Sequence, residues 1–225
     1  MSIEAKKIEQ DDALLALIKK MVETPGPSGQ EQLIRAAILE EIQGSADEIR
    51  TDAMGNLITR KGSKQPNGLR IMISAHMDEI GLMVTHVDED GFVRFISIGG
   101  VSPLTCIGGR VIFMNGQRGV IGCERLEPNA LPTLEKLFID VGATSREDCP
   151  VKFGVVCGFA RPFFALGKHL VANSMDNRIS LVVAIQALRA LKARPHAFYF
   201  FFSFPDVFLF PVSATPAYVF DPDLG

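Results

Sequence analysis

Glycines and turn signals are concentrated in one internal stretch of this sequence, and that concentration limits the folds open to the chain. Of its 20 glycines, 13 lie between positions 81 and 167. Asp90-Gly91 and Asn115-Gly116 separate alternating apolar runs there, which is a strong signal for β-hairpins. This stretch therefore predicts a small antiparallel barrel or sandwich. Its expected strands are Leu82–Val87, Phe92–Ile98, Arg110–Met114, Val120–Glu124, Leu137–Val141 and Gly154–Phe159.

The segments on either side have the pattern of an α/β fold. Apolar stripes with helical spacing run over Leu14–Val22, Leu33–Ile42 and Ile179–Leu191. Runs typical of strands cover Glu48–Asp52, Leu57–Arg60, Leu69–Ala75 and Ala197–Phe204. The simplest architecture is an α/β domain, formed by residues 1–80 and 168–225, interrupted by an inserted β domain at 81–167.

A turn, Pro25-Gly-Pro-Ser-Gly29, separates the first two expected helices. Ser28 is followed three residues later by Glu31, the spacing of a capping box. We therefore expect both side chains to cap the second helix.

Composition and charge exclude several classes of protein. The chain has 225 residues, of which 47% are hydrophobic and 22% charged, as in an ordinary globular protein. Its net charge of −3 provides no electrostatic footprint for nucleic acid. The charged start, Met1–Asp12, is no secretory signal. The four cysteines form no CxxC pair, which favours free thiols in a reducing cytoplasm over disulfides or a cysteine metal site.

The end of the chain, residues 204–225, forms an aberrant tail, because its amino-acid composition differs from that of the rest of the chain. Residues 198–225 carry eight of the 16 phenylalanines and no Lys or Arg. A membrane anchor over Ala197–Phe220 is one alternative for this apolar stretch. Asp206 and the prolines at 205, 211 and 216 make it a poor spanning helix, so we expect no membrane partner.

The segment Ser74-Ala-His76-Met-Asp78-Glu79 is the sharpest chemical feature. It follows an expected buried strand, and ligand sites in open α/β sheets gather at the carboxyl ends of strands. His76 and Asp78 would point to the same side, so the carboxylate could orient an imidazole bound to zinc. The simpler alternative is a surface histidine beside ordinary acids.

Asp176 is the second candidate, at the start of an expected helix in Ser174-Met-Asp-Asn-Arg178. A carboxylate at this position is favoured by the helix dipole and could act only as a cap. The metal-ligand alternative requires Asp176 to meet His76 in space across the β insert.

Several motifs together resemble one family, the glutamyl and tetrahedral aminopeptidases, co-catalytic metallopeptidases of the cytoplasm once mislabelled as cellulases. In chain order the motifs are Gly26-Pro-Ser-Gly29, Asp52-x-x-Gly55-Asn56, Ser74–Gly81, Ser174–Arg178 and Asp221-Pro-Asp-Leu-Gly225. The resemblance implies a zinc-peptidase-like catalytic domain with a mixed sheet, interrupted by a β-barrel dimerisation domain. It covers nearly the whole chain up to about Phe200.

The resemblance also implies roles for individual residues. His76 matches a ligand of one metal, Asp78 the acid that orients it, and Asp176 the carboxylate that bridges two metals, before a cis peptide bond. Two zinc or cobalt ions would polarise the scissile carbonyl of a peptide and bind its amino terminus. The barrel matches a domain whose dimers build a dodecamer.

The sequence departs from the family at one place. Relatives end the strand after the Asp-Asn helix with a Gln-Glu-Glu segment, whereas this chain reads Ser203-Phe-Pro-Asp206 and has no Glu after Glu147. The chain therefore resembles a C-terminally truncated member. Its expected function is a metal-dependent aminopeptidase, and the alternative is an inactive subunit that acts only as a scaffold.

Overall fold

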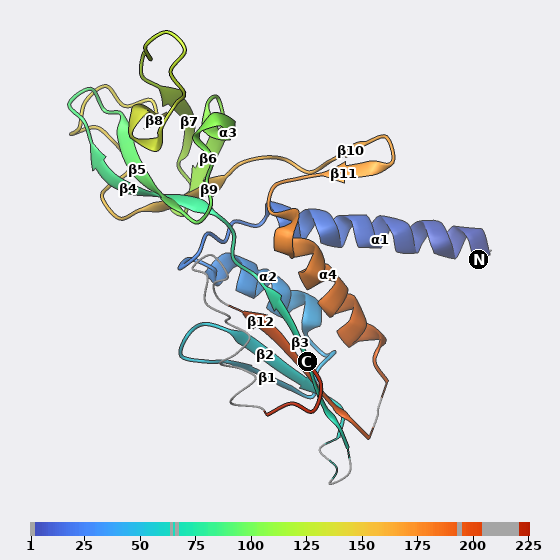
Figure 1. The fold of residues 1–225 in the computed structure, drawn as a ribbon. Coiled ribbons are helices and arrows are strands. Elements are labelled where there is room, and N and C mark those ends of the chain that lie inside the picture. Colours follow the sequence, from blue (N-terminus) through green and yellow to red (C-terminus); the bar gives the residue numbers. More distant parts are fainter. Residues whose placement is uncertain (1–2, 64, 66–67, 193–194, 204–220) are drawn as a thin grey trace.

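The computed structural model describes residues 3–63, 65, 68–192, 195–203 and 221–225 (Figure 1). The helices are α1 (Ile3–Glu23), α2 (Gln32–Ile42), α3 (Pro103–Cys106), a 3-10 turn η1 (Leu134–Lys136) and α4 (Met175–Ala190). The strands are β1 (Glu48–Thr51), β2 (Leu57–Lys61), β3 (Arg70–His76), β4 (Gly81–Val87), β5 (Val93–Ile98), β6 (Arg110–Phe113), β7 (Arg118–Cys123), β8 (Leu137–Asp140), β9 (Val156–Phe159), β10 (Phe164–Leu166), β11 (His169–Val171) and β12 (Ala197–Ser203). The expected α/β fold is confirmed.

A mixed sheet forms one part of the molecule, with the strand order β1-β2-β12-β3. β12 pairs antiparallel with β2 and parallel with β3, and Ser203 lies opposite His76. The last residues of the chain lie along the outer edge of β3, where Met72 N donates to Leu224 O over 2.8 Å. The bridge between Ile71 and Leu224 thus lies on the outer edge of β3 near its start, and the carboxyl end of β3 lies beside Ser203 of β12.

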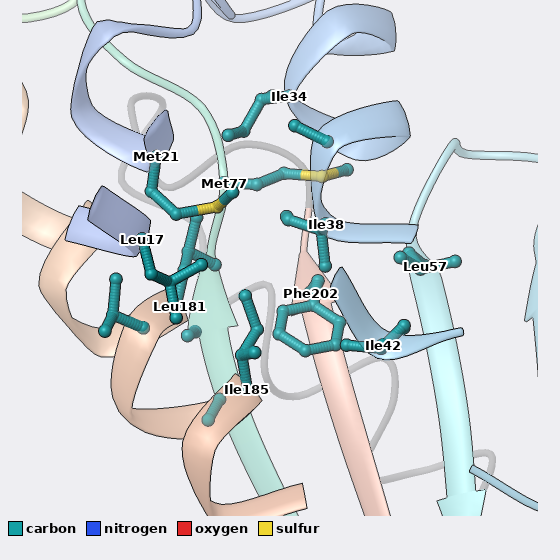
Figure 2. Packing of buried hydrophobic residues seen from close by; sticks show 14 of the residues in the cluster. Leu17, Met21, Ile34, Ile38, Ile42, Leu57, Met77, Leu181, Ile185 and Phe202 are labelled. Atoms are coloured by element: carbon teal, nitrogen blue, oxygen red, sulfur yellow. The ribbon is translucent and has the colours of Figure 1, made fainter. Parts of the chain in front are cut away.

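The core of this part lies where α1, α2 and α4 pack on the sheet (Figure 2). Alternation along β12 turns Phe200 and Phe202 toward the helices, and neither is exposed. Tyr199 and Phe201 alternate with them and are also buried. Burial on both faces explains why this strand is a continuous aromatic run rather than an alternating one.

The barrel closes in the order β4-β5-β8-β7-β6-β9, because β4 pairs with β5 on one edge and β9 on the other. Each of the strands expected between residues 81 and 167 is present, with small shifts at the ends. The open choice between barrel and sandwich is settled in favour of the barrel. Its separate core includes Leu82, Val111 and Phe113.

Some elements differ from expectation. The β10–β11 hairpin, which projects beside α1 in Figure 1, has no predicted counterpart. The capping box was wrong: α2 begins at Gln32, its N-cap is Glu31, and no side chain caps it. All four cysteines are free, as expected. Within the described part of the chain, no helix combines the length and apolarity needed to cross a membrane.

Candidate metal centre

At the end of β3 and in the loop after it, successive side chains point to opposite sides of the chain. His76 ends the strand, and Met77 is fully buried against Ile34, Ile38 and neighbouring core side chains (Figure 2). Met77 N also donates to Ser203 O over 3.0 Å, which holds the loop to the end of β12. With Met77 anchored in the core, His76 and Asp78 lie on the other side of the chain, as the sequence predicts.

The imidazole of His76 lies between two carboxylates. Its Nδ1 is 3.0 Å from Asp78 Oδ1, and its Nε2 is 3.6 Å from Asp176 Oδ1. The side chain of Asp78 is fully buried, that of His76 is 15% exposed, and that of Asp176 is 97% exposed. The expected meeting of His76 and Asp176 across the β insert is therefore present in space.

Asp176 lies where the first turn of α4 is irregular. Asp176 and Asn177 have non-helical backbone angles, and the peptide bond between them is cis, as the resemblance predicts. The N-cap residue of α4 is Ser174, which has a left-handed backbone with φ 54°. A simple capping role does not describe Asp176, because its carboxylate lies at His76 and the N-cap is another residue.

The two donors His76 and Asp176 are spaced as two ligands of one divalent transition metal would be. Two ligands on one zinc ion, each about 2.1 Å from it at a tetrahedral angle, lie roughly 3.4 Å apart. The 3.6 Å between His76 Nε2 and Asp176 Oδ1 agrees with that separation. Within the described ranges, no group of three or more His, Cys, Asp or Glu side chains could hold a metal. Asp206 and most of the tail lie outside the described residues.

A buried acid next to Asp78 joins three segments around the site. Glu79, 6% exposed, accepts hydrogen bonds from Gly26 N over 2.8 Å and Asn173 Nδ2 over 3.1 Å, and another from Ser174 Oγ. Its carboxylate therefore ties the Pro25–Gly29 turn and the segment before α4 to the loop after β3.

Arg178 provides the opposite charge within this network. Its side chain is fully buried, and its Nη2 lies 3.8 Å from Glu79 Oε1. Nη1 donates to Met21 O over 2.9 Å, in the last turn of α1, and to Thr24 O over 3.2 Å, just after that helix. Burial lowers the pKa of the Arg178 guanidinium, while the nearby acids oppose that shift.

Of the two residues in the expected capping box, Ser28 bonds to the site and Glu31 is buried near it. Ser28 Oγ donates to Asp78 Oδ2 over 2.5 Å. Glu31 is 3% exposed, and burial raises the pKa of its carboxyl from 4.5 to about 7, with Asp78 adding to the rise. Sequence reasoning missed the roles of Ser28, Glu79 and Arg178, although each stands inside a motif that it singled out.

A cavity of about 440 Å³ opens on the barrel side of the network. Glu79 reaches its wall, whereas His76 and Asp176 do not line it. Its remaining wall comes from the end of α1 and from β6, β7 and β9, including Arg110, Arg118 and Arg161. This cavity is thus separate from the paired donors His76 and Asp176.

The sequence profile of a known family, described as M42 glutamyl aminopeptidase, matches residues 55–206. The chain belongs to the M42 glutamyl aminopeptidase family. The matched range includes His76, Asp78 and Asp176. Within this family the chain is similar to the lysyl aminopeptidase of Pyrococcus furiosus, at 34% identity over 224 residues, which cover 93% of this chain and 64% of that protein.

Solved structures of an aminopeptidase and of a TET peptidase share the fold. An aminopeptidase of the archaeon Desulfurococcus kamchatkensis superposes with a TM-score of 0.88 at 33% identity, covering 94% of this chain and 61% of that one. The TET1 peptidase of Pyrococcus horikoshii gives a TM-score of 0.84 at 29% identity, covering 93% and 66%. The chain thus spans about two thirds of the length of the relatives it matches.

Proposed function

We propose that this chain is a metal-dependent aminopeptidase subunit that removes N-terminal residues from peptides. The observation that carries the proposal is the approach of Asp176 to His76 Nε2, while Nδ1 of the same ring is held by buried Asp78. Membership of the M42 family supports the same activity.

His76 and Asp176 would hold a divalent ion, zinc or cobalt, and a second ion would share Asp176. Bound metal would polarise the scissile carbonyl and bind the free amino terminus of the peptide. Asp78 orients the imidazole and keeps the proton on Nδ1, so that Nε2 carries the lone pair toward Asp176. The high exposure of Asp176 leaves its second oxygen accessible for a bridging role.

The alternative function is that of an inactive subunit that only assembles. It is favoured by the sequence, which has no Glu after Glu147 to act as the general base that the family resemblance implies. Asp206 is the acid nearest to the expected position and has a shorter side chain.

We further propose that the subunit forms homo-oligomers through the barrel, dimers first and dodecamers from them. Apolar side chains on its surface support this, among them Leu104 at 61% exposure and Val120 at 47%. The TET1 peptidase of Pyrococcus horikoshii is described as assembling into a tetrahedron or a large octahedral shell. The inserted domain would comprise residues 81–167, and the four free thiols favour a cytoplasmic location.

The test is a peptidase assay on the full chain. The protein is freed of metal, supplied with zinc or cobalt, and offered aminoacyl-p-nitroanilides. We expect turnover that requires added metal and is lost in His76→Ala. His86→Ala is the matched control, because it removes an exposed barrel imidazole, and it should keep the activity. Assembly by size-exclusion chromatography without turnover would instead establish the scaffold.

A further inference from the structure

We propose that Ser28 is a positioning residue for the metal centre. Its hydroxyl holds the carboxylate of Asp78, and through Asp78 it fixes the tautomer and orientation of His76. The proposal rests on the proposed function, since it assigns a purpose to the imidazole that the metal would bind. Nothing in the family comparison or the capping-box pattern assigns this role to Ser28.

The geometry forms a continuous chain of contacts. Ser28 Oγ donates to Asp78 Oδ2 over 2.5 Å, and Asp78 Oδ1 lies 3.0 Å from His76 Nδ1. The two oxygens of one carboxylate thus serve two different partners. Asp78 is fully buried and Ser28 is 7% exposed, so water cannot readily replace the hydroxyl. Rotation of the Asp78 carboxylate would break both contacts together.

The backbone brings Ser28 to this place independently of its hydroxyl. Ser28 N donates to Glu79 O over 3.1 Å, and Glu79 N donates to Gly26 O over 3.0 Å. Pro27 and Glu79 form a parallel bridge between these bonds. Because these contacts use backbone atoms, Ser28→Ala should keep the loop in place and remove only the hydrogen bond to Asp78.

The buried carboxylate of Asp78 requires a hydrogen-bond donor where the hydroxyl of Ser28 lies. An ionised carboxylate only accepts hydrogen bonds, so each buried oxygen needs a donor. His76 provides one through Nδ1–H, and Ser28 provides the other. Without the hydroxyl, Asp78 loses one of the hydrogen bonds that fix its rotation, and the preference of the imidazole for the proton on Nδ1 weakens. The Nε2 lone pair would then face Asp176 for only part of the time.

The first test measures the tautomer directly in metal-free full chain. Ring-¹⁵N-labelled histidine is observed by two-bond ¹⁵N–¹H NMR, at an alkaline pH where the ¹⁵N shifts themselves show a neutral ring. His76→Gln assigns the signal. We expect the Nδ1–H tautomer in the unmodified chain, a mixture in Ser28→Ala, and recovery in Ser28→Thr, which keeps a hydroxyl.

Thr144→Ala is the matched control, because it removes a hydroxyl from the barrel carboxylate of Asp148 rather than from Asp78. Its His76 signal should keep the Nδ1–H tautomer. An unchanged tautomer in Ser28→Ala would overturn the proposal. So would a tautomer mixture in Ser28→Thr equal to that in Ser28→Ala, because the role would then not belong to the hydroxyl.

The second test measures zinc affinity by competition with a chelating indicator. Ser28→Ala should weaken binding about tenfold, the lower end for outer partners of a metal ligand. In an Asp78→Asn background the same substitution should add little, because Ser28 acts through Asp78. Equal weakening in both backgrounds would overturn the proposal. If the unmodified chain binds no zinc, the proposed function fails, and the tautomer measurement still decides the role of Ser28.

Discussion

Glu31 is expected to make the folded chain less stable as the pH rises. Its carboxyl is 3% exposed, and burial raises its pKa from 4.5 to about 7. Between these two pH values the unfolded chain has released the proton and the folded chain still holds it. The folded state therefore binds more protons, and the free energy of unfolding falls as the pH rises through this window.

The size of the effect follows from the shift. A rise from 4.5 to about 7 corresponds to about 3 kcal/mol at 1.36 kcal/mol per pKa unit. Glu31→Gln imitates the protonated acid at every pH, and its amide oxygen can still accept from Gly29 N, as the carboxyl does over 2.5 Å. The variant should be more stable than the unmodified chain by about 3 kcal/mol near pH 8, and by less than about 1 kcal/mol near pH 5.

Urea denaturation of both proteins across this pH range measures the difference directly, since contributions of other titrating groups cancel. Glu40→Gln is the control: it changes an acid of the same helix whose side chain is 72% exposed and pairs with Lys20, and its effect should stay within about 1 kcal/mol. The reasoning is refuted if Glu31→Gln gains equally at both ends of the range, or gains nothing near pH 8.

Three further substitutions test the packing and the buried charges by urea denaturation. Phe200→Ala, at an unexposed position of β12, should cost about 3–5 kcal/mol; a smaller loss would mean that the core around it collapses easily. Gly81→Ala should cost about 1–3 kcal/mol because its Cβ would lie 2.7 Å from Cys157 O, whereas Gly100→Ala, with open space around it, should be close to neutral. Arg178→Met should cost about 3–5 kcal/mol by leaving Glu79 buried without its cation, and adding Glu79→Gln should recover part of that loss. Additive losses would contradict the pairing.

Much of the fold follows from local signals in the sequence. Every barrel strand could be predicted, because hairpin turns such as Asn115-Gly116 and alternating apolar residues are local features. The pairing of His76 with Asp78 could be predicted for the same reason, since alternation in an extended chain places residues two apart on one side. By contrast, the β10–β11 hairpin was missed because its strands of three residues are too short for a periodic pattern.

The buried polar groups were harder to predict because their partners are remote in the sequence. The spacing of Ser28 and Glu31 satisfies a local cap equally well, and only the approach of Asp78 shows that the hydroxyl is used elsewhere. Arg178 is similar: a charged residue near a helix start is ordinarily exposed, yet this one reaches the carbonyl of Met21. Tertiary contacts, rather than propensity, decide both cases.

The alternation that places His76 and Asp78 together also explains why two acids follow the imidazole. Asp78 lies toward His76, and Glu79 lies on the opposite side, facing the barrel, the Pro25–Gly29 turn and Arg178. One acid orients the donor, and its neighbour joins the segments that carry Ser28 and Asp176. A change at Glu79 should therefore disturb the candidate metal centre by moving whole segments, whereas a change at Ser28 should disturb the imidazole of His76 alone. The effects of the two changes can be measured separately, because only the change at Glu79 should lower the free energy of unfolding by several kcal/mol.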